Sequence, residues 1–113
     1  MTPLELLKRC ALDVYGPECA KCGHVVARPQ LDHIEPRSHS DLRVLDPDNV
    51  QILCPDCNRL KADTHHDYRR FESFRRALRI VYVNALAQEI ENQRHMIELL
   101  TRAKEKKNGR KQS

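Results

Sequence analysis

Apolar residues recur every three or four positions over the first 15 residues, a spacing that predicts an amphipathic helix. The face that repeats consists of Leu4, Leu7, Ala11 and Val14. Thr2 and Glu5 flank Pro3 with the spacing of a capping box, and Gly16 followed by Pro17 is typical of a helix end. We expect this helix to pack against the core and to carry no chemistry.

The middle of the chain alternates between short apolar runs and turn-forming residues. Residues 30–34 and 50–53 are candidate strands, and the polar segment between them contains a predicted turn at residues 46–48. Pro55 directly follows Cys54, a position that favours the start of a helix. The predicted order is therefore strand, loop, strand, helix.

A long helical pattern runs from about Tyr68 to Lys107, and its apolar register changes midway. The first half carries an apolar stripe beside a basic one, the latter formed by Arg69, Arg75, Arg76 and Arg79. The second half keeps a heptad seam of Val83, Leu86, Ile90, Gln93, Ile97 and Leu100. Such a seam predicts a partner helix, in a homodimer or a larger assembly; the alternative is that the segment folds back on its own domain.

These patterns divide the chain into a body at residues 1–66, a long helix at 67–107 and a basic tail at 108–113 that we expect to be disordered. The net charge is +4, but residues 1–68 hold 8 basic against 11 acidic side chains, and residues 69–113 hold 12 against 5. The positive charge of the C-terminal third predicts contact with a polyanion such as a nucleic acid, although a solvated charged helix has the same composition.

Cysteine spacing is the strongest chemical signal. Two Cys-x2-Cys pairs, Cys19/Cys22 and Cys54/Cys57, can close a tetrahedral structural zinc site, which leaves Cys10 as a buried free thiol. No segment resembles a membrane span or a signal peptide, so we expect a cytoplasmic protein without membrane contact. In that compartment thiolates on zinc are favoured over two disulfides.

Between and after these pairs stand Asp-His-Ile-x-Pro at residues 32–36 and Asn-Val-Gln-Ile-Leu-Cys-x2-Cys-Asn-x2-Lys at residues 49–61. In this order the motifs resemble those of the HNH endonucleases, over residues 19–61 but not over the C-terminal helix. The resemblance implies a small α+β fold of the ββα-metal (His-Me finger) type with a structural zinc held by four cysteines. The three name-giving positions correspond to His33, Asn49 and Asn58, the last with asparagine in place of histidine.

The resemblance implies a DNA endonuclease that leaves a 5′-phosphate, with His33 as general base and Asn49 holding the loop. Asp32 and Asn58 would ligate Mg²⁺ or Mn²⁺ through hard oxygen atoms. Neighbouring strand residues point to opposite faces, so Asp32 and His33 converge only if the strand ends or bulges there, as the resemblance implies. We expect the four arginines of the basic stripe to contact phosphates, and Lys61 either to do the same or to be solvated.

Two other functions share these motifs. One is a zinc-dependent DNA-binding module that uses the fold without cleaving. The other is a nuclease subunit that is active only inside a larger complex.

Overall fold

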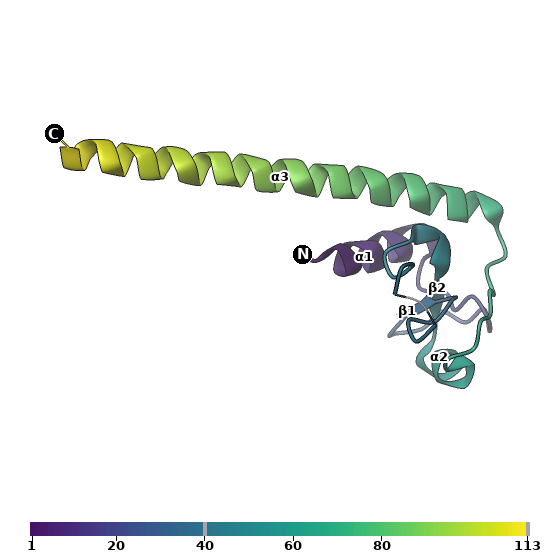
Figure 1. Ribbon diagram of the computed structural model, residues 1–113. Helices are drawn as coiled ribbons and strands as arrows, with labels where there is room; N and C mark the ends of the chain where they lie inside the picture. The colour runs from purple at the N-terminus through teal and green to yellow at the C-terminus, as the bar shows by residue number, and fades with distance from the viewer. Residues whose placement is uncertain (40, 113) are drawn as a thin grey trace.

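A two-stranded hairpin and the helix after it form the centre of the molecule. The computed structural model describes residues 1–39 and 41–112. β1 (Gln30–His33) pairs antiparallel with β2 (Val50–Leu53), and α2 (Pro55–Lys61) follows β2 after a single residue. Figure 1 shows this ββα unit below a long helix that extends well past it. The predicted strands and the predicted helix start at Pro55 are confirmed.

Helix α1 (Pro3–Tyr15) precedes the hairpin and has the capping box that its sequence predicts. The Glu5 backbone N–H donates to Thr2 Oγ1 over 3.2 Å, and the Thr2 N–H donates to Glu5 Oε2 over 3.0 Å. At the other end Gly16 has φ = 77°, a left-handed value that costs glycine little. Both helix ends are therefore fixed by local sequence.

The core lies between α1, β2 and the first turns of α3 (Glu72–Gln112). All four residues of β2 are buried, as a strand covered on both faces requires. The buried core residues are Leu7, Cys10, Ala11, Val50, Ile52, Leu78 and Tyr82. The Tyr82 hydroxyl also donates to the Pro3 carbonyl over 3.2 Å, which ties α3 to the start of α1.

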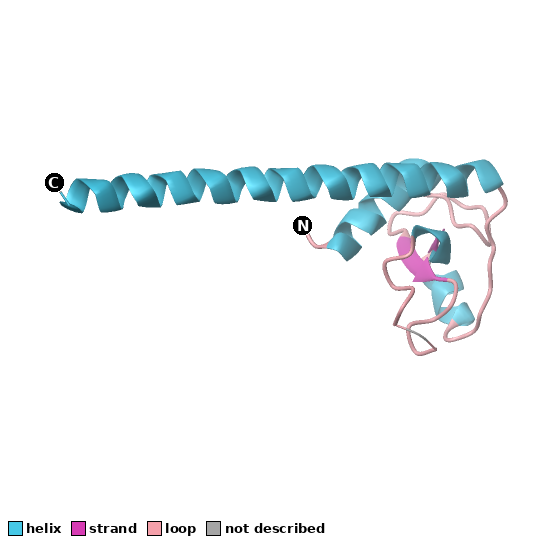
Figure 2. Cartoon of the chain, turned by 45° about the horizontal axis from the view of Figure 1, so that its top comes forward, coloured by secondary structure: helices cyan, strands magenta, loops and turns pink. Residues whose placement is uncertain are grey.

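The long helix begins at Glu72, later than the predicted start at Tyr68. Two hydrogen bonds hold the preceding residues out of the helix: the Tyr68 N–H donates to Gln51 Oε1 over 2.8 Å, and the Arg69 N–H donates to Asp67 Oδ1 over 3.0 Å. These bonds override a periodicity that continues upstream. Residues 62–71 instead run as a connection beside the hairpin (Figure 2).

At its far end α3 continues to Gln112, through most of the segment expected to be a disordered tail, while Ser113 lies outside the described residues. A terminal helix can still fray in solution, so that disorder stays a prediction. Throughout the described part of the chain, every helix lacks the combination of length and apolar character needed to cross a membrane.

Candidate active site and metal centre

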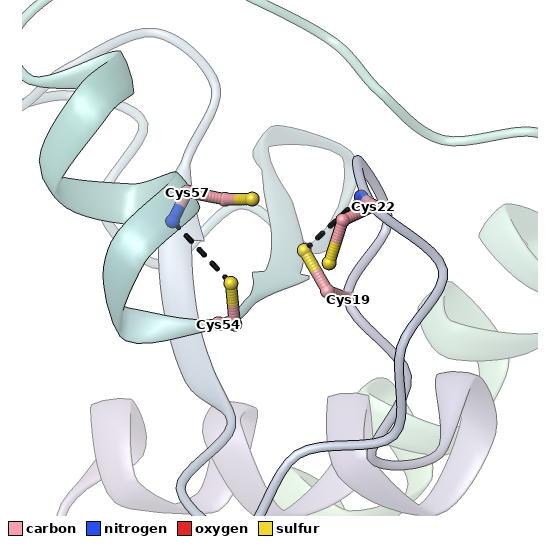
Figure 3. Close-up of side chains that lie close together, drawn as sticks. All are labelled: Cys19, Cys22, Cys54 and Cys57. Atoms are coloured by element: carbon pink, nitrogen blue, oxygen red, sulfur yellow. Dashed lines mark hydrogen bonds between the residues drawn. The ribbon is translucent and has the colours of Figure 1, made fainter.

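Four cysteine side chains from the two ends of the central segment meet at one point. Cys19 and Cys22 lie on the turn before β1, while Cys54 caps α2 and Cys57 lies in its first turn. Their sulfur atoms all lie within 4.8 Å of one another, and Figure 3 shows them directed into a common space. Tetrahedral zinc with Zn–S bonds of about 2.3 Å needs sulfurs about 3.8 Å apart. The four thiols can therefore hold a structural metal such as zinc.

Backbone N–H groups favour negative charge at this centre. The Cys22 N–H donates to Cys19 Sγ over 3.5 Å, and the Cys57 N–H donates to Cys54 Sγ over 3.3 Å. Burial alone would raise the pKa of Cys19, but backbone hydrogen bonds lower it to about 6. A side-chain hydrogen bond with Cys54, followed by burial, raises the pKa of Cys57 to about 12. The first negative charge therefore settles on Cys19, whereas Cys57 keeps its proton until a metal ion displaces it.

Asn49 holds the loop between the strands. It is 1% exposed, and its side-chain amide both accepts from the Glu35 N–H over 2.9 Å and donates to the carbonyl of the same residue over 3.2 Å. It donates to the Arg43 carbonyl as well, over 3.2 Å. These bonds fit the loop-holding role that the resemblance implied for this residue.

His33 is the last residue of β1, and its ring is oriented by that loop. Its Nε2 atom lies 2.9 Å from the carbonyl oxygen of Val44. Because a carbonyl can only accept, Nε2 carries the hydrogen, and in the neutral ring Nδ1 is left with a lone pair. A backbone contact thus selects the tautomer in which Nδ1 is the basic atom.

His33 and Asn58 share an open cleft of about 410 Å³ that residues of α1, β1 and α2 line. Polar side chains from α1, β1, the following loop and α2 line it: Glu5, Lys8, Gln30, His33, Arg37 and Asn58. The Asn58 Nδ2 group donates to Gln30 Oε1 over 2.7 Å, which leaves Oδ1 as the atom that this amide could offer to a metal. The structure therefore brings together a candidate base and a candidate oxygen ligand.

Asp32 does not line this cleft, although we expected it to converge with His33. The register is continuous through both residues, with Asp32 opposite Gln51 and His33 opposite Val50, so their side chains take opposite sides of the ladder. Asp32 Oδ2 accepts from Gln51 Nε2 over 2.9 Å and forms an ion pair with Lys61 Nζ at 3.3 Å. The carboxylate therefore already has a buried cationic partner, and its role as a metal ligand stays a prediction.

Two of the residues predicted to contact phosphate are engaged inside the protein. Lys61 is 2% exposed and pairs with Asp32. The Arg69 side chain is 7% exposed, donates to the Asp48 carbonyl over 2.7 Å and pairs with Asp67 at 2.8 Å. Each of these charges is buried against an acceptor of the chain, so phosphate contact by either residue would require its internal pair to open and stays a prediction.

The remaining three arginines lie on the first turns of α3. Arg79 and Arg75 form ion pairs with the carboxylate of Asp48, at 2.6 Å and 3.5 Å, whereas Arg76 is exposed. Asp48 is thus an acidic anchor for α3 that sequence reasoning missed. Gln51 was also missed, although a polar residue inside an apolar strand was a signal of a buried hydrogen-bonding role.

A hairpin followed by a helix, tied by four cysteines and carrying a histidine at the end of its first strand, defines a small zinc-finger-like ββα domain. Comparison with protein families gives a match to the HNH endonuclease family over residues 17–64, somewhat less than half of the chain. Comparison with curated proteins gave no match, and neither did comparison with solved structures. The matched residues include both cysteine pairs and the whole ββα unit.

Proposed function

We propose that this protein is a metal-dependent endonuclease that hydrolyses DNA phosphodiester bonds and leaves a 5′-phosphate. The observation that carries the proposal is the orientation of His33, whose Nε2 is held by the Val44 carbonyl on the rim of an open polar cleft. A histidine fixed in this tautomer can take a proton from an attacking water at Nδ1. The HNH family match supports the same chemistry.

In this proposal each polar residue of the site has one task. His33 Nδ1 accepts the proton of the water, and Asn49 keeps the loop that carries the Val44 carbonyl in place. A divalent ion, Mg²⁺ or Mn²⁺, would neutralise phosphoryl oxygens and stabilise the leaving alkoxide when bound. The Asn58 amide oxygen fits such an ion, whereas Asp32 fits only after its ion pair with Lys61 has opened.

The DNA would reach the cleft over basic side chains. Lys8 and Arg37 line the cleft itself, and Arg76 is exposed on the first turns of α3. With 12 basic against 5 acidic residues from position 69 onwards, the long helix supplies the wider positive field.

We also propose that the protein is cytoplasmic, where the four thiols stay reduced and hold zinc as a structural ion. It would act as a homodimer or as part of a larger assembly.

One observation favours a second function, a DNA-binding module that does not cleave. The Asp32 carboxylate already has a buried ammonium partner, so the site is electrically balanced without a catalytic metal. Such a domain would keep the zinc-tied fold and the basic helix but hold no ion at Asn58. Nuclease activity then decides between the two functions.

A plasmid-nicking assay with the full chain tests the proposal. The zinc-loaded wild type should nick supercoiled DNA with Mg²⁺ or Mn²⁺ but not with EDTA, and His33→Ala should lower the rate by about a hundredfold or more while DNA affinity is unchanged. His39→Ala, which alters an exposed histidine of the same loop, is the matched control. Full activity of His33→Ala would overturn the assignment of the base.

Two further results have separate meanings. DNA binding without nicking, in every metal tested, would support the non-cleaving module. Nicking that requires an added cellular fraction would indicate a subunit of a larger nuclease. Circular dichroism and zinc content of His33→Ala show whether the variant is folded, since the ring also contacts the Val44 carbonyl.

A further inference from the structure

The second half of α3 presents an apolar stripe to solvent. Contacts with the core end near Leu86, which packs only at the edge of the buried cluster. Beyond that point Figure 1 shows the helix projecting away from the body. From Val83 onwards the helix carries large apolar side chains that are 56–63% exposed: Val83, Ile90, Met96, Ile97 and Leu100. Such a stripe on a charged helix is a surface that a partner covers.

The residue types along this stripe indicate how many helices pack together and in which direction they run. When the seam is read as a heptad, the a positions are Val83, Ile90 and Ile97, and two of the three d positions are leucines, Leu86 and Leu100. β-branched residues at a with leucine at d favour two parallel helices over three or four. We propose that this face binds a second copy of the same chain as a parallel two-stranded coiled coil.

Charge complementarity supports the parallel direction. Glu89 occupies a g position and Arg94 the following e position. In a parallel pair a g residue lies opposite the next e residue of the partner helix, so two symmetric glutamate–arginine contacts form. In the antiparallel pairing that matches all six seam positions, Glu89 faces Met96 and Arg94 faces Ala87 instead. Arg94 now pairs with Glu91 at 3.2 Å, an exposed contact that is easily exchanged.

The polar seam residue fits the same arrangement. Gln93 stands at the middle d position, where a parallel in-register pair places it against Gln93 of the second copy. Two side-chain amides can donate to and accept from each other there. A single polar layer of this kind fixes register at some cost in stability.

The seam is short, but its helix is already formed. Isolated helices of about two and a half heptads are marginal in water because nucleation is costly. Here Leu78 is fully buried and the Tyr82 hydroxyl is hydrogen-bonded to the Pro3 carbonyl, so the body already holds the turns of α3 before the seam in helical form. Association therefore costs less conformational entropy than the pairing of two free peptides, which would first have to become helical. A parallel pair also places both bodies at the same end of the coil.

Sedimentation equilibrium of the zinc-loaded full chain tests the face. The wild type should be a dimer at tens of micromolar, and Ile90→Glu with Ile97→Glu should raise the dissociation constant by more than about a hundredfold, because it buries unpaired charge. Gln88→Glu with His95→Glu makes the same charge change on the opposite f positions and should leave the dimer intact. If the wild type is a monomer, the proposal is wrong and the face would instead bind a different protein.

A cysteine scan tests the direction. Gln93→Cys should form a disulfide-linked dimer on mild oxidation, because residue 93 faces itself only in the parallel register, whereas Gln88→Cys should not. In a separate experiment, Glu89→Arg chains mixed with Arg94→Glu chains should form mixed dimers in preference to either self-dimer. A wild-type dimer in which Gln93→Cys does not cross-link would overturn the parallel arrangement.

Discussion

Lys61 Nζ lies 3.3 Å from Asp32 Oδ2, and the two side chains are 1% and 7% exposed. The same ammonium donates to the His33 carbonyl over 3.0 Å, and Gln51 completes the surroundings of the carboxylate. The pair links α2 to β1 directly behind the strand end that carries His33. It also decides whether Asp32 is available to a metal.

Replacing Lys61 should show whether Asp32 can bind a metal. Lys61→Met leaves a buried carboxylate without a cationic partner, which we expect to lower the free energy of unfolding by about 3–5 kcal/mol. Added Mn²⁺ should restore more stability to this variant than to the wild type if Asp32 can act as a ligand. Urea unfolding at constant free zinc, with and without Mn²⁺, measures both effects.

A neutral version of the pair is the control for that experiment. Asp32→Asn combined with Lys61→Met leaves no buried charge and should be less destabilised than Lys61→Met alone, with no response to Mn²⁺. Equal Mn²⁺ stabilisation of the single and double variants would place the ion elsewhere.

Variants of Asn58 should separate metal binding from proton transfer. Asn58→Ala removes an oxygen ligand from the cleft, so cleavage should need a higher Mg²⁺ or Mn²⁺ concentration and also become slower. Asn58→His should be the mildest change, since an imidazole can still ligate. Nicking rates measured across a metal titration give both quantities. An unchanged metal requirement in Asn58→Ala would remove Asn58 from the ligand set.

Zinc removal should unfold the body of the protein. The four thiols join the turn before β1 to the start of α2, so one zinc per chain connects the two ends of the ββα unit. Chelation, or Cys54→Ser, should abolish the folded circular dichroism signal of the body and any nuclease activity. Cys10→Ser is the control, because Cys10 lies in the core between α1, β2 and α3 and is not one of the four clustered thiols. Intact structure in zinc-free Cys54→Ser would contradict a structural ion.

The pH dependence of zinc binding follows from the thiol pKa values. Zinc takes thiolates, so a thiol that is protonated in the free protein must give up its proton. With its pKa raised to about 12, Cys57 releases nearly a full proton on binding at pH 7, whereas Cys19, with its pKa lowered to about 6, releases little. Zinc affinity should therefore fall as pH drops, and more steeply below about pH 6. Competition with a chelator, from about one pH unit below the Cys19 pKa to two units above it, measures this slope.

Replacing Arg76 should affect DNA binding, whereas replacing Arg69 should affect the stability of the fold. Arg76→Ala removes an exposed charge and should weaken DNA binding while reducing the salt dependence by about one ion. Arg69→Ala leaves the Asp48 carbonyl without its donor and should instead lower the free energy of unfolding, by about 1–3 kcal/mol. Fluorescence anisotropy over a salt series, with urea unfolding, distinguishes them. Weaker binding by a stably folded Arg69→Ala would restore its phosphate role.

The sequence alone determined the features that rest on local chemistry. The capping box of Thr2 and Glu5 and the start of α2 at Pro55 depend on residues close in the chain. The zinc cysteines could be paired because each Cys-x2-Cys turn has to aim both sulfurs at one ion. The motifs at residues 32–36 and 49–61 revealed the resemblance to the HNH endonucleases for the same reason, because their order and spacing can be read directly from the sequence.

Tertiary structure decided where charged groups lie. Lys61 looked like a solvent-exposed helix residue, and only the position of α2 against β1 buries it on Asp32. Arg69 looked like part of a helical basic stripe, but hydrogen bonds with Asp67 and Asp48 hold it before the helix. A sequence gives the charge of a side chain, whereas its burial and its partner depend on segments far away along the chain. That geometry sets whether the charge meets solvent, a phosphate or another residue.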